Sequence, residues 1–355
     1  MAPLILNLKK EKYFKVKVCV TAQHRGMLDE VLNLFRIKPD YDLNLMKKNQ
    51  SINDIASKII KKIDNVLNLS KPDLVLVHGD TSTTLYSAIA SFNKKIKIGH
   101  IEAGLRTFNL DFPWPEESNR QIVSKLSSFH FAPTKIAKQN LIQEGIKKKD
   151  VFVTGNTIID SLLIASKLID SKKALKKELE NKFKFLKKEK KLILVTGHRR
   201  ENFGKSLKNI CLALKQLSKL DIEIIYPVHL NPKINIPVNN MLNNVKNIKL
   251  CSPLDYISFV YLMTKSYLII TDSGGIQEEA PTLGKPVLVT REVTERPEAL
   301  EVGTVKLVGS NQDKIVSEAT KLLNNKNEYN KISFKQNPYG DGKSSLRISK
   351  ILKKI

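Results

Sequence analysis

Cysteine is scarce in this sequence of 355 residues, which contains Cys19, Cys211 and Cys251 and no other. An odd number of widely spaced cysteines does not build a disulfide framework, and it fits the reducing cytoplasm. The sequence has no apolar run of the roughly 18 residues needed to cross a bilayer, and it lacks the apolar core and cleavage site of a signal peptide. We therefore expect a cytoplasmic protein that does not insert into membranes.

Aromatic residues make up only 6% of the sequence, and they do not alternate with the basic residues that give a net charge of +25. Stacking on single-stranded nucleic acid needs such alternation, and no zinc-finger or basic-zipper spacing is present. In residues 165–191 lysines alternate with glutamates, as on a solvated helix. Nucleic-acid binding is therefore not expected, and the charge suits attraction of an anionic substrate.

Short β-branched runs alternate with amphipathic stretches, a pattern typical of βα units and parallel sheets. The length favours two domains, and the strand pattern restarts after a lysine-rich stretch, which indicates a boundary near 156–190. The predicted strands are 15–22, 73–78, 96–101, 129–133 and 151–154 in the first half, and 191–196, 222–228, 247–251, 267–271, 286–289 and 305–308 in the second.

Four of the six histidines lie at or just after the ends of predicted strands, accompanied by acids or arginines. These residues are His78, Asp80, His100, Glu102, His198, Arg199, Arg200 and His229. Open parallel sheets bind ligands at the carboxyl ends of their strands, so the pattern favours a ligand site there. A single histidine in such a place is about as often structural, because its two nitrogens readily find partners.

Glu116 lies in the segment "PWPEESNR", only 14 residues after Glu102, and a loop joins the two. Asp80, Glu102 and Glu116 are therefore expected to converge. Carboxylates in one site push their pKa values apart, which lets one act as a base and another as an acid. The alternatives are helix capping by Glu116, or a metal site that includes His78 and His100. Metal is less favoured, because basic residues border these motifs and no HExxH-like pair is present.

The stretch "LIITDSGGIQEEAP", residues 268–281, runs from an apolar strand through Gly274 and Gly275 into a helix. Free backbone N–H groups at a helix start, without a Cβ in the way, suit a diphosphate. Ser273 can donate a further hydrogen bond, and Glu279 can accept from ribose hydroxyls. The alternative is a tight turn whose acids simply favour the helix N-terminus.

Many of these segments together resemble the non-hydrolysing UDP-N-acetylglucosamine 2-epimerases of bacteria. They are "VTAQHRGMLDEVL", "VHGDTSTT", "GHIEAGLRT", "PWPEESNR", "VTGNTIID", "VTGHRRENFG", "YPVHLNP", "TDSGGIQEEAPTLGKPVLV" and "TERPEAL". The resemblance implies a GT-B architecture, two Rossmann-like domains facing across a cleft. It places an N-terminal domain in 1–160, a UDP-binding domain in 161–338, and in 339–355 a helix that returns to the first domain.

The resemblance also implies interconversion of UDP-GlcNAc and UDP-ManNAc for surface polysaccharide synthesis, commonly by a homodimer. We expect no metal or other cofactor. The family's route eliminates UDP to give 2-acetamidoglucal and then adds UDP back, with the proton delivered to the other face. By resemblance, the catalytic residues are Asp80, Glu102, Glu116 and His198. The UDP pocket would contain Phe259, Ser273, Gly274, Gly275, Glu279 and Arg296. A second, regulatory UDP-GlcNAc would contact Gln23, Arg199, Arg200 and His229.

Two rival functions remain: a hydrolysing epimerase that releases ManNAc and UDP, and a non-catalytic UDP-sugar binder. The second is motivated by the start of the sequence, where "MAPLILNLKKEK" predicts a helix. Family members have a strand and a "GTRPEAIK"-like loop before this point. Loss of a central strand would remove buried aliphatic residues worth about 1.5 to 3 kcal/mol each. We expect an extended protein that contains both to melt higher and turn over faster than residues 1–355.

Overall fold

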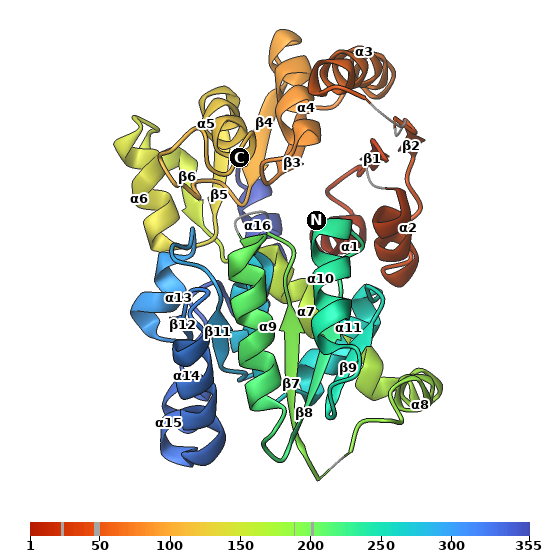
Figure 1. Ribbon diagram of the computed structural model, residues 1–355. Helices are drawn as coiled ribbons and strands as arrows, with labels where there is room; N and C mark the ends of the chain where they lie inside the picture. Colours follow the sequence, from red (N-terminus) through yellow and green to blue (C-terminus); the bar gives the residue numbers. More distant parts are fainter. Residues whose placement is uncertain (23–24, 46–49, 188, 200–201) are drawn as a thin grey trace. The chain divides into compact units, whose positions relative to one another are not determined.

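The computed structural model describes residues 1–22, 25–45, 50–187, 189–199 and 202–355 (Figure 1). Contacts between residues divide the chain into two compact units. One consists of Met1–Ser161 together with Tyr339–Ile355, and the other of Leu162–Pro338. No helix in the described part of the chain is long and apolar enough to span a membrane.

The first unit contains a parallel four-stranded sheet in the order β3-β4-β5-β6 and a separate parallel pair, β1-β2. Its strands are β1 (Cys19–Val20), β2 (Tyr41–Asp42), β3 (Leu74–His78), β4 (Lys97–Ile101), β5 (Phe129–Ala132) and β6 (Val151–Val153). Its helices are α1 (Ala2–Lys10), α2 (Arg25–Leu34), α3 (Ile52–Ser70), α4 (Ser82–Asn93), α5 (Glu116–Leu126), α6 (Lys135–Gln143), the short η1 (Lys148–Asp150), the start of α7 (Thr157–Ser171), and α16 (Ser344–Leu352).

The first strand of the structure is shorter than the sequence predicts. Residues 15–22 were expected, but only Cys19 and Val20 pair with a neighbouring strand. The backbone N–H of Val18 donates to the carboxylate of Asp40 instead, so the ladder begins one residue later. The partner strand β2 has two residues, too few to show a period in the sequence.

The last helix packs within the first unit, although it follows the whole second unit in the chain. The Asp160 carboxylate accepts hydrogen bonds from the backbone N–H groups of Ser344 and Ser345 at the start of α16, at 3.2 and 2.8 Å. An acid at a helix N-terminus stabilises it through its free N–H groups. Farther along, Ile348 of α16 lies in one apolar cluster with Leu4 of α1.

The second unit contains one parallel sheet in the order β12-β11-β10-β7-β8-β9. Its strands are β7 (Lys191–Thr196), β8 (Ile222–Pro227), β9 (Ile248–Cys251), β10 (Leu268–Thr271), β11 (Val287–Val289) and β12 (Val305–Leu307). Its helices are the rest of α7, α8 (Lys173–Lys182), α9 (Lys205–Leu217), α10 (Pro232–Leu242), α11 (Tyr256–Lys265), α12 (Gly274–Thr282), α13 (Pro297–Val302), α14 (Gln312–Asn324) and α15 (Lys326–Ser333).

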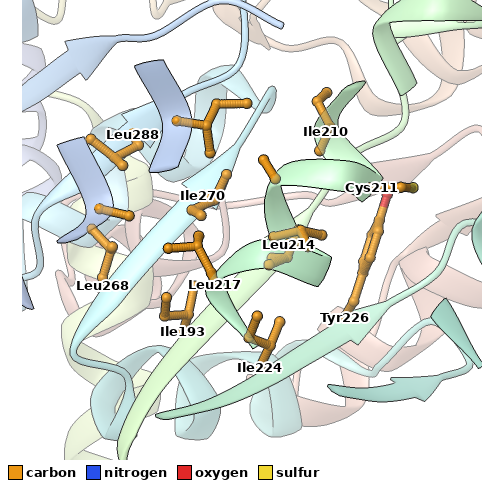
Figure 2. Close-up of a cluster of buried hydrophobic side chains, with 14 of the residues drawn as sticks. Ile193, Ile210, Cys211, Leu214, Leu217, Ile224, Tyr226, Leu268, Ile270 and Leu288 are labelled. Carbon is orange, nitrogen blue, oxygen red and sulfur yellow. The ribbon is translucent and has the colours of Figure 1, made fainter. Parts of the chain in front are cut away.

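The core of this unit lies where α9 covers the sheet. Figure 2 shows Ile210, Leu214 and Leu217 of α9 beside strand residues such as Ile193 and Ile224, all within one buried cluster. Burial of each such side chain contributes about 1.5 to 3 kcal/mol. The apolar residues of α9 recur every three or four positions, which keeps them on the face turned toward the sheet.

The strand order of the second unit is that of a doubly wound nucleotide-binding sheet. The chain starts at β7, moves outward through β8 to β9, and returns to β10 on the other side of β7. The connections after β7 and β10 therefore leave the sheet in opposite directions. This reversal is the point at which such sheets bind ligands, beyond the carboxyl ends of their strands.

Candidate active site

The connections after β7 and β10 meet at the reversal point. The two strands end in register at Thr196 and Thr271, whose hydroxyl oxygens lie 2.6 Å apart. Just beyond, His198 follows β7 and Asp272 follows β10, with His198 Nδ1 3.4 Å from Asp272 Oδ1. The His198 side chain is 44% exposed, so it is accessible to a ligand at this edge. Burial lowers the pKa of His198.

The glycine turn lies beside the same edge. Ser273 is the N-cap residue of α12, and its side chain does not cap the helix. A Cβ at Gly274 would lie 3.2 Å from Glu295 Oε1 and 3.6 Å from Arg296 Nη2, so charged side chains pack directly against the bare backbone. Gly274 and Gly275 are the first residues of α12, where backbone N–H groups have no partner within the helix. This geometry is suited to a phosphate.

A buried cluster of charges adjoins the turn. The Glu295 carboxylate contacts Arg199 at 3.2 Å, Arg291 at 2.5 Å and Arg296 at 3.9 Å, and Arg296 also pairs with Glu278. Burial alone would raise the pKa of Glu295, but the three arginines lower it to about 2. Among the described residues, the cluster thus brings the guanidinium groups of three arginines to the carboxylates of Glu295 and Glu278.

The predicted ribose acceptor Glu279 is buried on α12, at 5% exposure. Its Oε1 accepts a hydrogen bond of 2.9 Å from the hydroxyl of Tyr256, the first residue of α11. Burial raises the pKa of Glu279 to about 7, against the effect of the Tyr256 hydrogen bond. Phe259, predicted near the uracil, lies three residues after Tyr256 on α11 and so on the same side of that helix.

Asp80, which follows β3 in the first unit, is held by α5. Arg120 Nε donates to Asp80 Oδ2, and Arg120 Nη2 lies 2.8 Å from the same oxygen. The side-chain amide of Asn119 donates through Nδ2 to the Asp80 backbone carbonyl. Arg120 Nη1 also contacts Glu117, which has no exposed surface. Arg120 thus fixes Asp80 by charge-assisted hydrogen bonds, the strong kind.

Glu102, which follows β4, has a backbone φ of 64°. The left-handed conformation costs a residue with a side chain about 1 to 3 kcal/mol and is concentrated at functional sites. Its Oε2 accepts from Asn156 Nδ2 at 3.0 Å and lies 3.6 Å from His78 Nε2. A Cβ added to Gly79 would lie 3.8 Å from its Oε1. Glu102 therefore lies beside the residue that precedes Asp80.

Glu116 is the first residue of α5, and Pro115 is its N-cap. The helix that begins at Glu116 is the one that holds Asp80, through Asn119 and Arg120. The neighbouring Glu117 accepts from the backbone N–H groups of Thr107 and Phe108, which folds the preceding loop onto the helix start. The convergence of Glu116 with the other two carboxylates stays a prediction.

His100 is buried and contacts the backbone, which fits a structural role rather than a ligand contact. It has no exposed surface, and its Nε2 lies 2.8 Å from the Gly79 carbonyl. Burial lowers the pKa of His100 to about 3, so it is neutral at physiological pH. Among the described residues, no group of three histidines, cysteines or acids is arranged to hold a metal ion.

The predicted regulatory residues are placed in part. His229 follows β8 and lies beside His198, with ring centroids 6.1 Å apart. Arg199 lies next to His198 and reaches Glu295. Gln23 and Arg200 lie outside the described residues.

Comparison with known proteins decides the family. The family described as UDP-N-acetylglucosamine 2-epimerase matches residues 6–353. The chain is 52% identical over 355 residues to the UDP-N-acetylglucosamine 2-epimerase of Escherichia coli strain K12, covering 99% of this chain and 94% of that protein. The chain belongs to the UDP-N-acetylglucosamine 2-epimerase family.

Solved structures of 2-epimerases agree. A crystal structure of the Neisseria meningitidis UDP-GlcNAc 2-epimerase bound to UDP-GlcNAc has a TM-score of 0.95 at 51% identity, over 100% of this chain and 96% of that one. The Methanocaldococcus jannaschii 2-epimerase in complex with UDP-GlcNAc and UDP has a TM-score of 0.85 at 35% identity, over 100% and 96%. A Rickettsia africae glycosyltransferase, at 16% identity with a TM-score of 0.63 over 99% and 94%, shows the likeness of fold alone. The predicted family and fold class are confirmed.

Several residues of this 2-epimerase that organise the site were not predicted from the sequence. Arg120, Asn156, Tyr256, Asp272 and Glu295 each contact a predicted residue or its neighbour. Asp272, Arg120, Asn156 and Glu295 all lie within segments quoted for the resemblance, but no role was predicted for them; for Asp272, its place directly after the apolar run was a usable signal. The others needed the fold, because their partners are distant in sequence.

The raised pKa of Glu279 predicts how stability depends on pH. Glu279 is neutral in both states below its unfolded pKa, and its burial becomes costly as pH rises toward the folded value of about 7. We expect the difference in free energy of unfolding, Glu279→Gln minus unchanged protein, to be larger at pH 8 than at pH 5. The increase should be about 2 to 3 kcal/mol, because only the unchanged protein must bury a charge at the higher pH. Denaturant unfolding at both pH values measures this. Glu301→Gln, on an exposed residue, is the matched control. A difference independent of pH would contradict the assignment.

Proposed function

We propose that the chain interconverts UDP-GlcNAc and UDP-ManNAc in the cytoplasm, for surface polysaccharide synthesis, and that it works as a homodimer. The observation that carries the proposal is a likeness over the whole chain to a 2-epimerase bound to UDP-GlcNAc. The three free cysteines fit a cytoplasmic location. In this proposal the first unit is the N-terminal Rossmann-like domain, and the second is the UDP-binding domain.

The reaction follows from the chemistry of the sugar. The C2 proton has no adjacent carbonyl group to make it acidic, so direct deprotonation is implausible. In the proposed route the bond between C1 and the diphosphate oxygen breaks and a base removes the C2 proton, which leaves UDP and 2-acetamidoglucal. UDP then adds back to C1 while an acid delivers a proton to the opposite face of C2. Such a route needs acid and base groups near C2 and positive charge near the leaving diphosphate.

Asp80, Glu102 and Glu116 are the proposed acid and base groups. Their surroundings differ: Asp80 is paired with a buried arginine, whereas Glu102 accepts from a neutral amide. Different surroundings are how an enzyme gives different tasks to similar carboxylates. His198, half-exposed at the reversal point, is the proposed contact of the diphosphate.

The glycine turn and its neighbours form the proposed UDP pocket. The N–H groups at the start of α12 would bind the diphosphate, with Ser273 and Arg296 beside them. Glu279 would accept from the ribose, and Phe259 would lie near the uracil. Arg199 and His229, with Gln23 and Arg200, would contact a second, regulatory UDP-GlcNAc.

Proton NMR of UDP-GlcNAc incubated with the protein tests the function. We expect the anomeric signal of UDP-ManNAc to grow until it reaches a fixed ratio with that of UDP-GlcNAc. Accumulation of free ManNAc with UDP would instead support the hydrolysing reaction. An unchanged spectrum, with UDP-GlcNAc still bound in an equilibrium assay, would support a binding protein.

We expect activity to survive exhaustive treatment with EDTA. The phosphate charge is met here by arginines and helix N–H groups, which need no ion. The measurement is the initial rate of UDP-ManNAc formation before and after chelation. Activity that is lost and then restored by a divalent cation would overturn this expectation.

A further inference from the structure

Asp272 has no exposed surface and accepts four hydrogen bonds at the end of β10. They come from the backbone N–H of His198 to both carboxylate oxygens, at 3.2 and 3.0 Å, from the backbone N–H of Arg199 at 3.0 Å, and from Asn202 Nδ2 at 3.0 Å. His198, Arg199 and Asn202, all in the connection after β7, therefore contact one carboxylate. Gly197 also lies beside this carboxylate, because a Cβ at that position would be 3.6 Å from Asp272 Oδ2.

The three donor groups, the backbone N–H of His198, the backbone N–H of Arg199 and the Asn202 amide, are neutral, yet a buried carboxylate is costly unless a charge compensates it. An asparagine could keep the oxygen that accepts from Arg199 and Asn202, but it would carry no charge and would place an NH2 group in the position of the oxygen beside the His198 ring. The imidazole of His198 lies 3.4 Å from Asp272 Oδ1 through its Nδ1. This distance is longer than a strong hydrogen bond, so the contact is mainly electrostatic.

We propose that Asp272 is a positioning residue for His198: its carboxylate fixes the Nδ1 side of the imidazole, so that Nε2 is directed to the departing diphosphate and carries a proton when the ring is cationic. The inference rests on the proposed elimination of UDP beside His198. A neutral ring held in this way carries its proton on Nδ1, because that nitrogen faces the acid. Nε2 then becomes a donor only after the ring gains a second proton.

The charges around His198 make this role necessary. Burial lowers the pKa of His198 most, the nearby Arg199, His229 and Arg291 lower it further, and the Asp272 charge raises it. Removal of the Asp272 charge therefore lowers the pKa of His198 further. A reaction that needs the cationic ring then declines at a lower pH than in the unchanged protein.

The test replaces Asp272 by asparagine in the full chain. We expect the pKa of His198, followed by NMR of its ring, to fall below that of the unchanged protein. The high-pH limb of kcat should move to lower pH, and kcat should drop by a factor of about 10 to 100 while KM changes little. Asp313→Asn, on an exposed residue of α14, is the matched control and should change neither quantity.

A second variant separates charge from shape. Asn202→Ala removes one donor to Asp272 but leaves the carboxylate, so the pKa of His198 should stay as in the unchanged protein. If the pKa of His198 were unchanged in Asp272→Asn, the proposal would be overturned. It would also be overturned if that pKa fell as far in Asn202→Ala as in Asp272→Asn.

The tautomer provides a readout that needs no variant at Asp272. Ring nitrogen shifts of the unchanged protein, assigned by their loss in His198→Asn, should show the neutral ring protonated on Nδ1. A neutral ring protonated on Nε2 would overturn the proposal even if Asp272→Asn does not fold. Both ring measurements are independent of turnover. A protein that did not catalyse the proposed reaction could therefore still confirm or contradict the role of Asp272.

Discussion

Replacement of His198 by alanine is expected to lower turnover of UDP-GlcNAc by a factor of about 100 or more, the usual effect of losing one preorganised group that stabilises charge in a transition state. The ring is half-exposed at the reversal point of the sheet. The Asp272 carboxylate accepts a hydrogen bond from the His198 backbone N–H and lies 3.4 Å from Nδ1 of the ring. The measurement is kcat from UDP-ManNAc formation at saturating substrate.

The fold should survive this change. The backbone N–H of His198, not its ring, donates the hydrogen bonds to Asp272, so the loop keeps its buried contacts in the alanine variant. The melting temperature should therefore stay within a few degrees of the unchanged value. Turnover equal to that of the unchanged protein would remove His198 from the mechanism.

Glu102→Gln is expected to lower turnover by a factor of about 100 to 10,000, the range for loss of a positioned acid or base. Glutamine keeps the shape and can still accept from Asn156, so the change removes the charge and the ability to exchange a proton. Initial rates of UDP-ManNAc formation and of deuterium incorporation at C2 in heavy water should fall together.

The matched control is Glu30→Gln, the same change on an exposed residue of α2. It should leave both rates unchanged. If Glu102→Gln lost UDP-ManNAc formation but kept deuterium exchange at C2, Glu102 would not be the group that handles the C2 proton, and the task would pass to Asp80 or Glu116.

The sequence was sufficient for most of the strands and for the polar residues that follow their carboxyl ends. Parallel strands are buried on both faces, so they appear as β-branched runs, and each polar residue after such a run falls at the same edge of its sheet. This is why His198 and the glycine turn were predicted in different segments and lie at one reversal point. The two-residue β2 had no such run and was missed.

Partners of the site residues were not predictable, because charge pairing is set by tertiary packing. Arg120 lies 40 residues after the Asp80 that it holds, and Tyr256 lies 23 residues before Glu279. The sequence analysis quoted Arg120 only as the last residue of "PWPEESNR" and gave it no role, and it did not single out Tyr256. Only the fold distinguishes a buried arginine with two carboxylates from an exposed one.

The left-handed backbone of Glu102 has a consequence for how this protein can evolve. Glycine adopts that conformation without strain, so a search for stability alone would favour glycine at position 102, by about 1 kcal/mol. The same substitution would delete one of the carboxylates proposed to act on the C2 proton. If Glu102 acts in the reaction as proposed, selection for stability and selection for turnover would favour different residues at this position.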